Sequence, residues 1–270
     1  MPKELRQLAA IAHAAGAVIM PHFRNRPAVR LKADDSPVTE ADEAAERLIL
    51  KRLREGWPDR PVVAEELAAT GAPMRSAPRF FLVDPLDGTR EFIAGRDEFT
   101  VNIALIDNAQ PACGVVYAPV GGRLYAAAAG HGAFHGVIDP ARDFDATALR
   151  LLPPPAAAPH RLRAVASRSH GTPRTERWLR EHGITDIVYS GSSLKLCVLA
   201  EGVAEVYPRL GPTNEWDVAA GHAVLAAAGG VVVDAETGRP LRYGKRERHF
   251  TNPPIIAFAP EVEPFGCSVR

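Results

Sequence analysis

Two short apolar runs in the first third of the chain each end in acidic residues, and this pattern constrains the fold more than any other feature. Residues 61–64 read Pro-Val-Val-Ala and precede Glu65 and Glu66, while residues 80–83 read Phe-Phe-Leu-Val and precede Asp84. Short continuous apolar runs are typical of strands that are buried on both faces. We therefore expect two strands that share one sheet edge lined with carboxylates. Because adjacent acids repel each other, we expect a cation beside one of Glu65 and Glu66, the alternative being that both lie at an exposed strand end.

The second acidic run continues through residues 84–89, which read Asp-Pro-Leu-Asp-Gly-Thr. Two carboxylates three positions apart, with a rigid proline between them, can converge on one point, and Mg²⁺ prefers such oxygen ligands. The carbonyl of Leu86 can supply another oxygen. Gly88 and Thr89 then open a predicted short helix, whose first N–H groups suit a phosphate. The alternative is a polar turn in which an aspartate caps the helix. We favour a metal site beside a phosphate site.

Two further acids lie at the starts of predicted helices. Asp42 follows Thr39 by three positions, at the start of a helix that we predict to continue through Leu53, and Asp217 opens an alanine-rich helix over 217–228. The Thr-x-x-acid spacing is that of a capping box, which serves only the helix end. The alternative is that Asp42 orients a hydroxyl group or a water molecule. On spacing alone, the structural role is the favoured interpretation for both acids.

The rest of the pattern predicts a mixed α and β chain with two lobes. Turn signals separate apolar segments that we expect to form antiparallel strands, and the proline-rich residues 153–159 are typical of a linker. Beyond this linker, strands and helices alternate, as in α/β folds. We predict an N-terminal α+β lobe over 1–152 with most of the metal ligands, and a C-terminal α/β lobe over 160–270 with Asp217 and the substrate-contacting loops. The predicted helices are 2–24, 39–53, 175–181, 194–200 and 217–228, and the predicted strands outside the two acidic runs are 100–106, 114–117, 123–128, 162–166, 187–189, 204–207 and 231–233.

The composition excludes several classes of protein. Hydrophobic residues make up 46% and charged residues 24%, which is typical of a folded globular protein rather than of a disordered one. The formal net charge of zero argues against binding to bulk nucleic acid. The three cysteines are widely spaced, so we expect no disulfide framework and a reducing, cytoplasmic environment. We see neither a signal-peptide pattern nor the roughly 20 consecutive apolar residues of a transmembrane helix.

Four separated blocks together resemble the inositol monophosphatase superfamily of Mg²⁺-dependent, lithium-sensitive phosphatases. The blocks are residues 36–42, residues 63–66, residues 84–89 and the pair Trp216-Asp217, and their order and spacing match over nearly the whole chain. The resemblance implies a layered αβαβα sugar-phosphatase fold. It also implies a cytoplasmic protein, either free or peripheral on the cytosolic face of the inner membrane, in a superfamily that contains both monomers and homodimers.

Within this superfamily, the blocks are most similar to the bacterial 3′(2′),5′-bisphosphate nucleotidases. Glu91 stands where inositol monophosphatases usually have Asn, and residues 167–170, 190–195 and 207–217 resemble the nucleotidases' substrate-contacting segments. This resemblance implies hydrolysis of 3′-phosphoadenosine 5′-phosphate to AMP and phosphate, a step of sulfur assimilation and nucleotide recycling. Two alternatives stay open. One is an inositol or other sugar phosphatase, and the other is a non-catalytic regulator that binds metal or nucleotide.

The resemblance also implies roles for single residues. Two or three Mg²⁺ ions would bind, and Thr89, held by Asp42, would orient the attacking water and accept its proton. For His170, Lys195 and Arg209, the alternative is an ordinary turn residue or solvated surface charge. The implied metal ligands are Glu65, Asp84, the carbonyl of Leu86, Asp87 and Asp217. The implied substrate contacts are Glu65, Leu86, Asp87, Gly88, Thr89, His170, Gly191, Lys195, Arg209 and Asp217.

Overall fold

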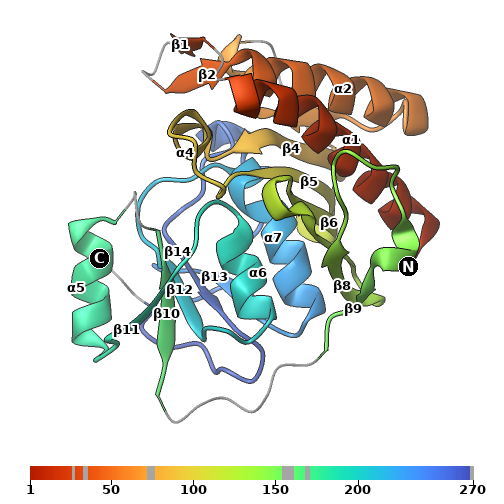
Figure 1. The fold of residues 1–270 in the computed structure, drawn as a ribbon. Helices are drawn as coiled ribbons and strands as arrows, with labels where there is room; N and C mark the ends of the chain where they lie inside the picture. The colour runs from red at the N-terminus through yellow and green to blue at the C-terminus, as the bar shows by residue number, and fades with distance from the viewer. Residues whose placement is uncertain (26–27, 33–35, 72–76, 154–160, 168–170, 268–270) are drawn as a thin grey trace.

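Helices and sheets alternate in five layers in the computed structural model (Figure 1). The model describes residues 1–25, 28–32, 36–71, 77–153, 161–167 and 171–267. A seven-stranded sheet forms the second layer and a five-stranded sheet forms the fourth. This arrangement confirms the expected αβαβα fold. The first layer consists of α1 (Lys3–Asn25) and α2 (Glu40–Gly56), the third of α6 (Leu194–Ala200) and α7 (Glu215–Ala227), and the fifth of α5 (Pro173–Glu181).

The seven-stranded sheet has its strands in chain order, and only its first pair is parallel. In that pair Ala64 lies opposite Val83, so the acids that follow the two strands emerge at the same sheet edge. The predicted acidic edge is therefore confirmed. The strands are β3 (Val62–Ala64), β4 (Arg79–Asp87), β5 (Thr100–Asp107), β6 (Gln110–Ala118), β7 (Arg123–Ala128), β8 (Gly132–Val137) and β9 (Arg150–Leu151).

Strand β4 is apolar without alternation because both of its faces are buried. Phe81 and Val83 pack in the core beneath α1 and α2, whereas Phe80 and Leu82 pack in the core shared with α6 and α7. Successive side chains of a strand point to opposite faces, so a strand between two helical layers needs apolar residues at every position. The continuous run in the sequence has this physical cause.

Helix α7 lies between the two sheets and contacts strands of both (Figure 1). After its first turn, its residues are apolar on nearly every side, with the buried His222 as the polar exception, as expected for a largely enclosed helix. Small residues let it approach the seven-stranded sheet closely. At Gly114 of β6, an added Cβ would lie 2.5 Å from the Cβ of Ala223 and would also collide with the carbonyl of Ala220. The first turn of this enclosed helix carries Asp217, which brings that acid into the interior.

The five-stranded sheet is mixed: β10, β11 and β12 are parallel, while β14 is antiparallel to its two neighbours. The predicted strand at 204–207 was placed two residues too early. Glu205 precedes the strand, and its carboxylate accepts the backbone N–H of Arg163 at 2.6 Å instead. The strands are β10 (Arg163–Ala166), β11 (Asp186–Tyr189), β12 (Val206–Arg209), β13 (Val231–Asp234) and β14 (Ile255–Phe258).

Several short elements have no clear sequence pattern and were not predicted. β8, β9 and β14 belong to this group, together with the hairpin of β1 (Val29–Leu31) and β2 (Pro37–Thr39) and the helix α3 (Glu65–Ala69). All three residues of β1 are exposed, so the hairpin lacks the alternation that marks a half-buried strand. Residues 154–159 of the predicted linker lie outside the described part of the chain, and the lobe boundaries stay a prediction. Among the described helices, none is long and apolar enough to span a membrane.

Candidate active site

Three carboxylates from three different elements converge at the acidic sheet edge. Glu65 is the first residue of α3, Asp84 lies in β4, and Asp217 lies in the first turn of α7. One oxygen from each of these side chains lies within 4.8 Å of the others. Burial raises the pKa of Asp84 and that of Asp217 well above the usual aspartate range, and the neighbouring carboxylates raise both further. Three acids in such a space need a cation, and their oxygens suit a hard divalent ion.

Backbone N–H groups fix two of these acids in place. Leu86 donates its N–H to Asp84 Oδ1 at 3.0 Å, and Asn214 donates its N–H to Asp217 Oδ2 at 2.9 Å. The second bond is half of a capping box between Asn214 and Asp217. The favoured sequence interpretation of Asp217 as a helix-start acid is therefore correct, yet the same carboxylate also belongs to the acid group. The N–H of Asn214 bonds to Oδ2 of Asp217, so Oδ1 of Asp217 does not take part in this bond.

Lys32 supplies the cation that we expected beside the adjacent glutamates. Its Nζ lies 2.8 Å from Glu65 Oε1 and 2.7 Å from Glu66 Oε1. Burial alone would lower the pKa of Lys32, but the two glutamates outweigh this effect and raise it. Burial raises the pKa of Glu66 to about 7 even with Lys32 in contact. Lys32 comes from the segment after β1, and the sequence alone did not single it out.

The contact between Asp42 and Thr89 joins α2 to the start of α4 (Thr89–Ile93). Asp42 Oδ2 accepts the backbone N–H and the hydroxyl of Thr39 at 2.8 and 2.6 Å, which completes a capping box. Asp42 Oδ1 accepts the hydroxyl of Thr89 at 3.1 Å. Burial raises the pKa of Asp42, whereas these hydrogen bonds oppose the rise. The two interpretations of Asp42 are thus not exclusive, because each oxygen serves one of them.

Residues 86–88 keep the backbone of this region in a tight arrangement. The carbonyl of Leu86 lies 3.2 Å from Thr89 Oγ1 and is an alternative acceptor for the proton of this hydroxyl. Gly88 has φ of 94° and precedes α4, a conformation that residues with a Cβ rarely adopt. Asp87 lies outside the group of three acids, and its Oδ2 accepts hydrogen bonds from Ser192 and Ser193.

A cleft of about 530 Å³ adjoins these residues. The residues that line it include Glu65, Asp87, Gly88, Thr89 and Asp217, together with the basic residues Lys195 and Arg209. An anionic ligand in this cleft would therefore meet two basic side chains as well as the carboxylates.

Lys195 is buried beside the cleft, contrary to the alternative of a solvated surface charge. Its Nζ donates to the carbonyl of Ser192 at 2.6 Å and lies 5.6 Å from the centre of the Tyr207 ring. Burial lowers its pKa to about 8. Arg209 donates to the carbonyl of Pro212 at 3.1 Å, while its buried Nε has no hydrogen-bond partner among the described residues.

Two of the expected substrate contacts, Leu86 and Gly191, are not among the described residues that line the cleft. A Cβ at Gly191 would lie 2.5 Å from Glu98 Cβ. His170 lies outside the described part of the chain. All three assignments stay predictions.

Sequence reasoning missed Asn102, a polar residue in the middle of a buried strand. It lies in β5 opposite Asp84, and its amide contacts Ser193 at 2.8 Å. The signal was available, because a lone amide in the apolar run 101–106 must satisfy its hydrogen-bonding groups inside the protein. Such a residue is often a support for a neighbouring polar site.

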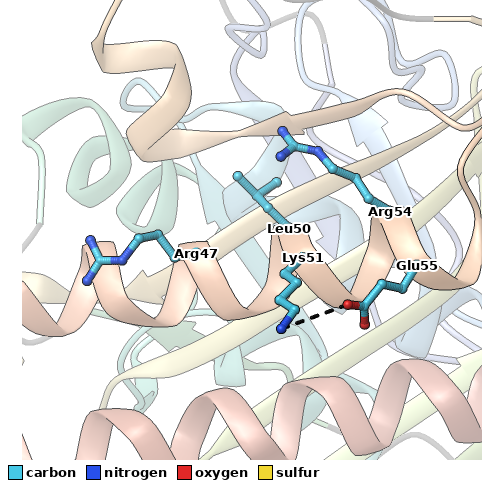
Figure 2. Close-up of a pocket in the computed structure, with 5 residues that line it drawn as sticks. All are labelled: Arg47, Leu50, Lys51, Arg54 and Glu55. Carbon is cyan, nitrogen blue, oxygen red and sulfur yellow. Dashed lines mark ion pairs between the residues drawn. The ribbon is translucent and has the colours of Figure 1, made fainter.

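A second hollow lies on the outer face of α2, away from the acidic edge. Figure 2 shows its lining, which comes from one helix and includes an ion pair of 3.9 Å between Lys51 and Glu55. Its side chains are mainly basic, and only one carboxylate is present. This hollow lacks the converging acids of the cleft, so the chemistry belongs to the cleft.

The sequence model of the Inositol monophosphatase family matches residues 2–260. The chain is 45% identical over 251 residues to the 3′(2′),5′-bisphosphate nucleotidase CysQ of Shigella flexneri, a match that covers 92% of this chain and 97% of the relative. The enzyme of the same name from Escherichia coli strain K12 matches with the same identity and coverage.

Solved structures agree with these matches. CysQ from Bacteroides thetaiotaomicron, described as a bacterial member of the inositol monophosphatase family, is 40% identical with a TM-score of 0.78, and the match covers 95% of this chain and 97% of that one. The extragenic suppressor protein SuhB of Bartonella henselae is 26% identical with a TM-score of 0.74, covering 96% and 95% of the two chains.

Proposed function

The chain belongs to the inositol monophosphatase family, and we propose that it is a Mg²⁺-dependent 3′(2′),5′-bisphosphate nucleotidase that converts 3′-phosphoadenosine 5′-phosphate to AMP and phosphate. The similarity to enzymes named 3′(2′),5′-bisphosphate nucleotidase extends over 92% of the chain, which supports this activity over the other phosphatase activities of the fold. All three cysteines are free, which is consistent with a cytoplasmic site of action.

The observation that carries the proposal is the convergence of Glu65, Asp84 and Asp217 beside a cleft with two basic side chains. The donor set consists of oxygens, as Mg²⁺ requires. Together with Asp87 and the carbonyl of Leu86, these acids would hold two or three Mg²⁺ ions. When bound, the ions would lower the pKa of water and neutralise charge on the phosphoryl group and the leaving oxygen.

Thr89 and Asp42 would manage the proton of the attacking water. The Thr89 hydroxyl has a single proton, and Asp42 Oδ1 and the carbonyl of Leu86 both lie within reach to accept it. With this proton directed at either acceptor, the lone pairs of Thr89 Oγ1 can accept a hydrogen bond from water. Asp42 thereby orients the hydroxyl and can take up the proton that Thr89 passes on.

The substrate's phosphates would lie between the acids and the basic side chains. Lys195, with its pKa of about 8, keeps much of its charge near neutral pH and would pair with one phosphate. Arg209 would offer its guanidinium group to the same anion. Backbone N–H groups of Gly88 and Thr89 would bind the phosphoryl oxygens. Gly191 and His170 are included in the proposal as contacts to the nucleotide.

A phosphate-release assay tests this proposal. The purified protein should release phosphate from 3′-phosphoadenosine 5′-phosphate in Mg²⁺, much faster than from inositol 1-phosphate or fructose 1,6-bisphosphate. EDTA should abolish the activity, and Li⁺ should inhibit it. A preference for either sugar phosphate would contradict the proposed substrate.

The variant Asp87→Asn tests the metal assignment in the same assay. Its kcat should fall by orders of magnitude while its thermal unfolding stays cooperative. Near-normal turnover in this variant would contradict the assignment of Asp87. An absence of activity of the wild-type protein on every substrate would favour a non-catalytic binding role.

A further inference from the structure

Asp87 is contacted by side chains from the loop that follows β11 of the five-stranded sheet and from the neighbouring strand of its own sheet. Its Oδ2 accepts hydrogen bonds from Ser192 Oγ at 2.5 Å and Ser193 Oγ at 3.0 Å, both from the loop between β11 and α6. Asn102 Nδ2, from β5 next to the strand that carries Asp87, lies 3.5 Å from the same oxygen. In the described part of the chain, no hydrogen bond reaches Asp87 Oδ1. One oxygen of this carboxylate is thus committed to the protein, and the other is left for a cation.

Ser193 Oγ is a junction between three elements. It accepts the amide N–H of Asn102 at 2.8 Å, and it lies 3.0 Å from Asp87 Oδ2 and 2.7 Å from the backbone carbonyl of Asp217. A serine hydroxyl has one proton and two lone pairs, so it accepts from Asn102 and directs its proton to one of the two acceptors. The hydroxyl therefore contacts both the end of β4 and the first turn of α7, and it donates its proton to one of them at a time.

The orientation of Asn102 is fixed as well. Its Oδ1 accepts the hydroxyl of Thr100 at 3.1 Å, which turns its Nδ2 towards Ser193. Asn102 is 1% exposed and Ser193 is 3% exposed, so water cannot replace these bonds easily. Thr100 also contacts the hydroxyl of Ser192. The result is a network of two hydroxyls from the loop (Ser192 and Ser193) with one hydroxyl and one amide from β5 (Thr100 and Asn102).

The loop that carries the serines is held in an unusual conformation. Ser192 has φ of 53°, in the left-handed region that non-glycine residues seldom occupy. Its neighbour Gly191 packs so closely on Glu98 that an added Cβ would lie 2.5 Å from Glu98 Cβ. Backbone strain of this kind is maintained only where the surroundings impose it. Here it turns two adjacent hydroxyls towards one carboxylate oxygen.

We propose that the Ser193–Asn102 junction is a positioning device for metal binding: it locks Asp87 Oδ2, presents Oδ1 to a cation, and couples Asp87 to the helix that carries Asp217. The inference rests on the proposed metal-dependent function and adds two residues that act through Asp87. Outer partners that orient a ligating carboxylate typically contribute about 10- to 100-fold to metal affinity.

Cation binding to the folded protein tests this inference without relying on turnover. Binding of Mn²⁺ to the metal-free protein is followed by calorimetry for the wild type, Ser193→Ala, Asn102→Ala and the double variant. Each single variant should raise the Kd for Mn²⁺ at one class of site by about tenfold. Because both residues act at one junction, the Kd of the double variant should lie within a factor of about two of the higher single-variant Kd.

Ser190→Ala is the matched control. Ser190 is buried in the same loop, and its backbone N–H bonds to the carbonyl of Ala166, which the substitution leaves intact. The control should bind Mn²⁺ as the wild type does. If one junction variant does not fold, the other still tests the same hydrogen bond, because the bond joins Asn102 to Ser193 and each variant removes one of its two partners.

The outcomes separate this inference from the proposed function. If the wild type binds no Mn²⁺, the metal-dependent function itself fails. If the wild type binds Mn²⁺ and the junction variants bind it equally well, the positioning role is wrong. It is also wrong if Ser190→Ala loses as much Mn²⁺ affinity as the junction variants do. Multiplicative losses in the double variant would likewise contradict a shared junction.

Discussion

Thr89 Oγ1 donates a hydrogen bond to Asp42 Oδ1 over 3.1 Å, although 47 positions separate the two residues along the chain. The other oxygen of Asp42 closes the capping box of α2 with Thr39. One carboxylate therefore holds a helix end with one oxygen and a candidate catalytic hydroxyl with the other. Structural and catalytic roles of Asp42 can be separated by substitutions that address one oxygen at a time.

The variant Asp42→Asn should lower kcat by about 100- to 10,000-fold, because an amide cannot accept hydrogen bonds with both of its polar atoms or take up a proton. The matched control is Thr39→Ala, which removes the cap but leaves the contact between Asp42 and Thr89. It should cost about 1 kcal/mol of stability and change kcat only slightly. Steady-state kinetics and thermal unfolding measure both. A loss of stability without loss of rate in Asp42→Asn would show that the cap is its whole role.

Glu46 gives the metal-free protein a predictable dependence of stability on pH. Burial raises its pKa from 4.5 to about 7, although its carboxylate accepts the backbone N–H of Glu66 at 2.8 Å. Between these two pH values the folded state binds more protons than the unfolded state, so the free energy of unfolding falls as pH rises from about 4.5 to about 7. This group alone contributes on the order of 3 kcal/mol to that fall.

The variant Glu46→Gln should remove this contribution, because its side chain is neutral at every pH and can still accept the N–H of Glu66. In EDTA, urea unfolding at pH 5 should give similar stabilities for variant and wild type, and at pH 8 the variant should be the more stable protein. Other buried acids titrate in both proteins, so only the difference between them is diagnostic. Equal stabilities at pH 8 would mean that Glu46 is ionised without a penalty.

The sequence predicted the acidic edge because its cause is local. The apolar run at 80–83 must be buried on both faces, and the acids directly after it can only emerge at the strand end. Asp42 and Asp217 were harder, since each spacing predicts a helix cap and the structure does contain both caps. Their second role depends on which oxygen faces Thr89 or the acid group, and spacing along the chain does not determine this. Resemblance to a known family supplied what local patterns could not.

The supports of the site were not predictable for a different reason. Lys32 reaches Glu65 across 33 positions, and Ser193 reaches Asp87 across 106. Both contacts depend on how the layers pack rather than on a local pattern. Asn102 is partly predictable from the sequence. An amide within a buried strand indicates that an internal hydrogen-bond partner exists, although it does not identify that partner.

Lys245, which is partly exposed, forms an ion pair with the fully buried Glu215, the first residue of α7. Its Nζ lies 2.7 Å from Glu215 Oε1, and the same carboxylate accepts the backbone N–H groups of Gly244 and Lys245 at 2.7 and 2.9 Å. Lys245→Met would leave a buried carboxylate without its cation, which typically costs about 3–5 kcal/mol. Urea unfolding should show this loss.

The exposed pair of Lys51 and Glu55 on α2 is the matched control for this substitution (Figure 2). Both side chains are more than half exposed, so solvent screens the pair and Lys51→Met should leave the unfolding midpoint unchanged within error. Equal effects of the two methionine substitutions would mean that the pair of Lys245 and Glu215 adds no more than a surface contact.

Gly114 has no side chain, and this lets α7, which carries Asp217, pack closely against the seven-stranded sheet. Gly114→Ala places a methyl group against Ala223 and the carbonyl of Ala220, so either the helix or the strand must shift. Such overpacking costs about 1–3 kcal/mol, and a shift of about 1 Å in a catalytic group can reduce the rate about 100-fold. We expect a lower unfolding midpoint together with weaker Mn²⁺ binding and a lower kcat.

Gly56→Ala is the control, because no atom lies within 4 Å of an added Cβ at this helix end. It should leave all three quantities unchanged or slightly raise the midpoint. A loss of stability in Gly114→Ala with unchanged Mn²⁺ affinity would show that the sheet supports α7 without setting the position of its acid.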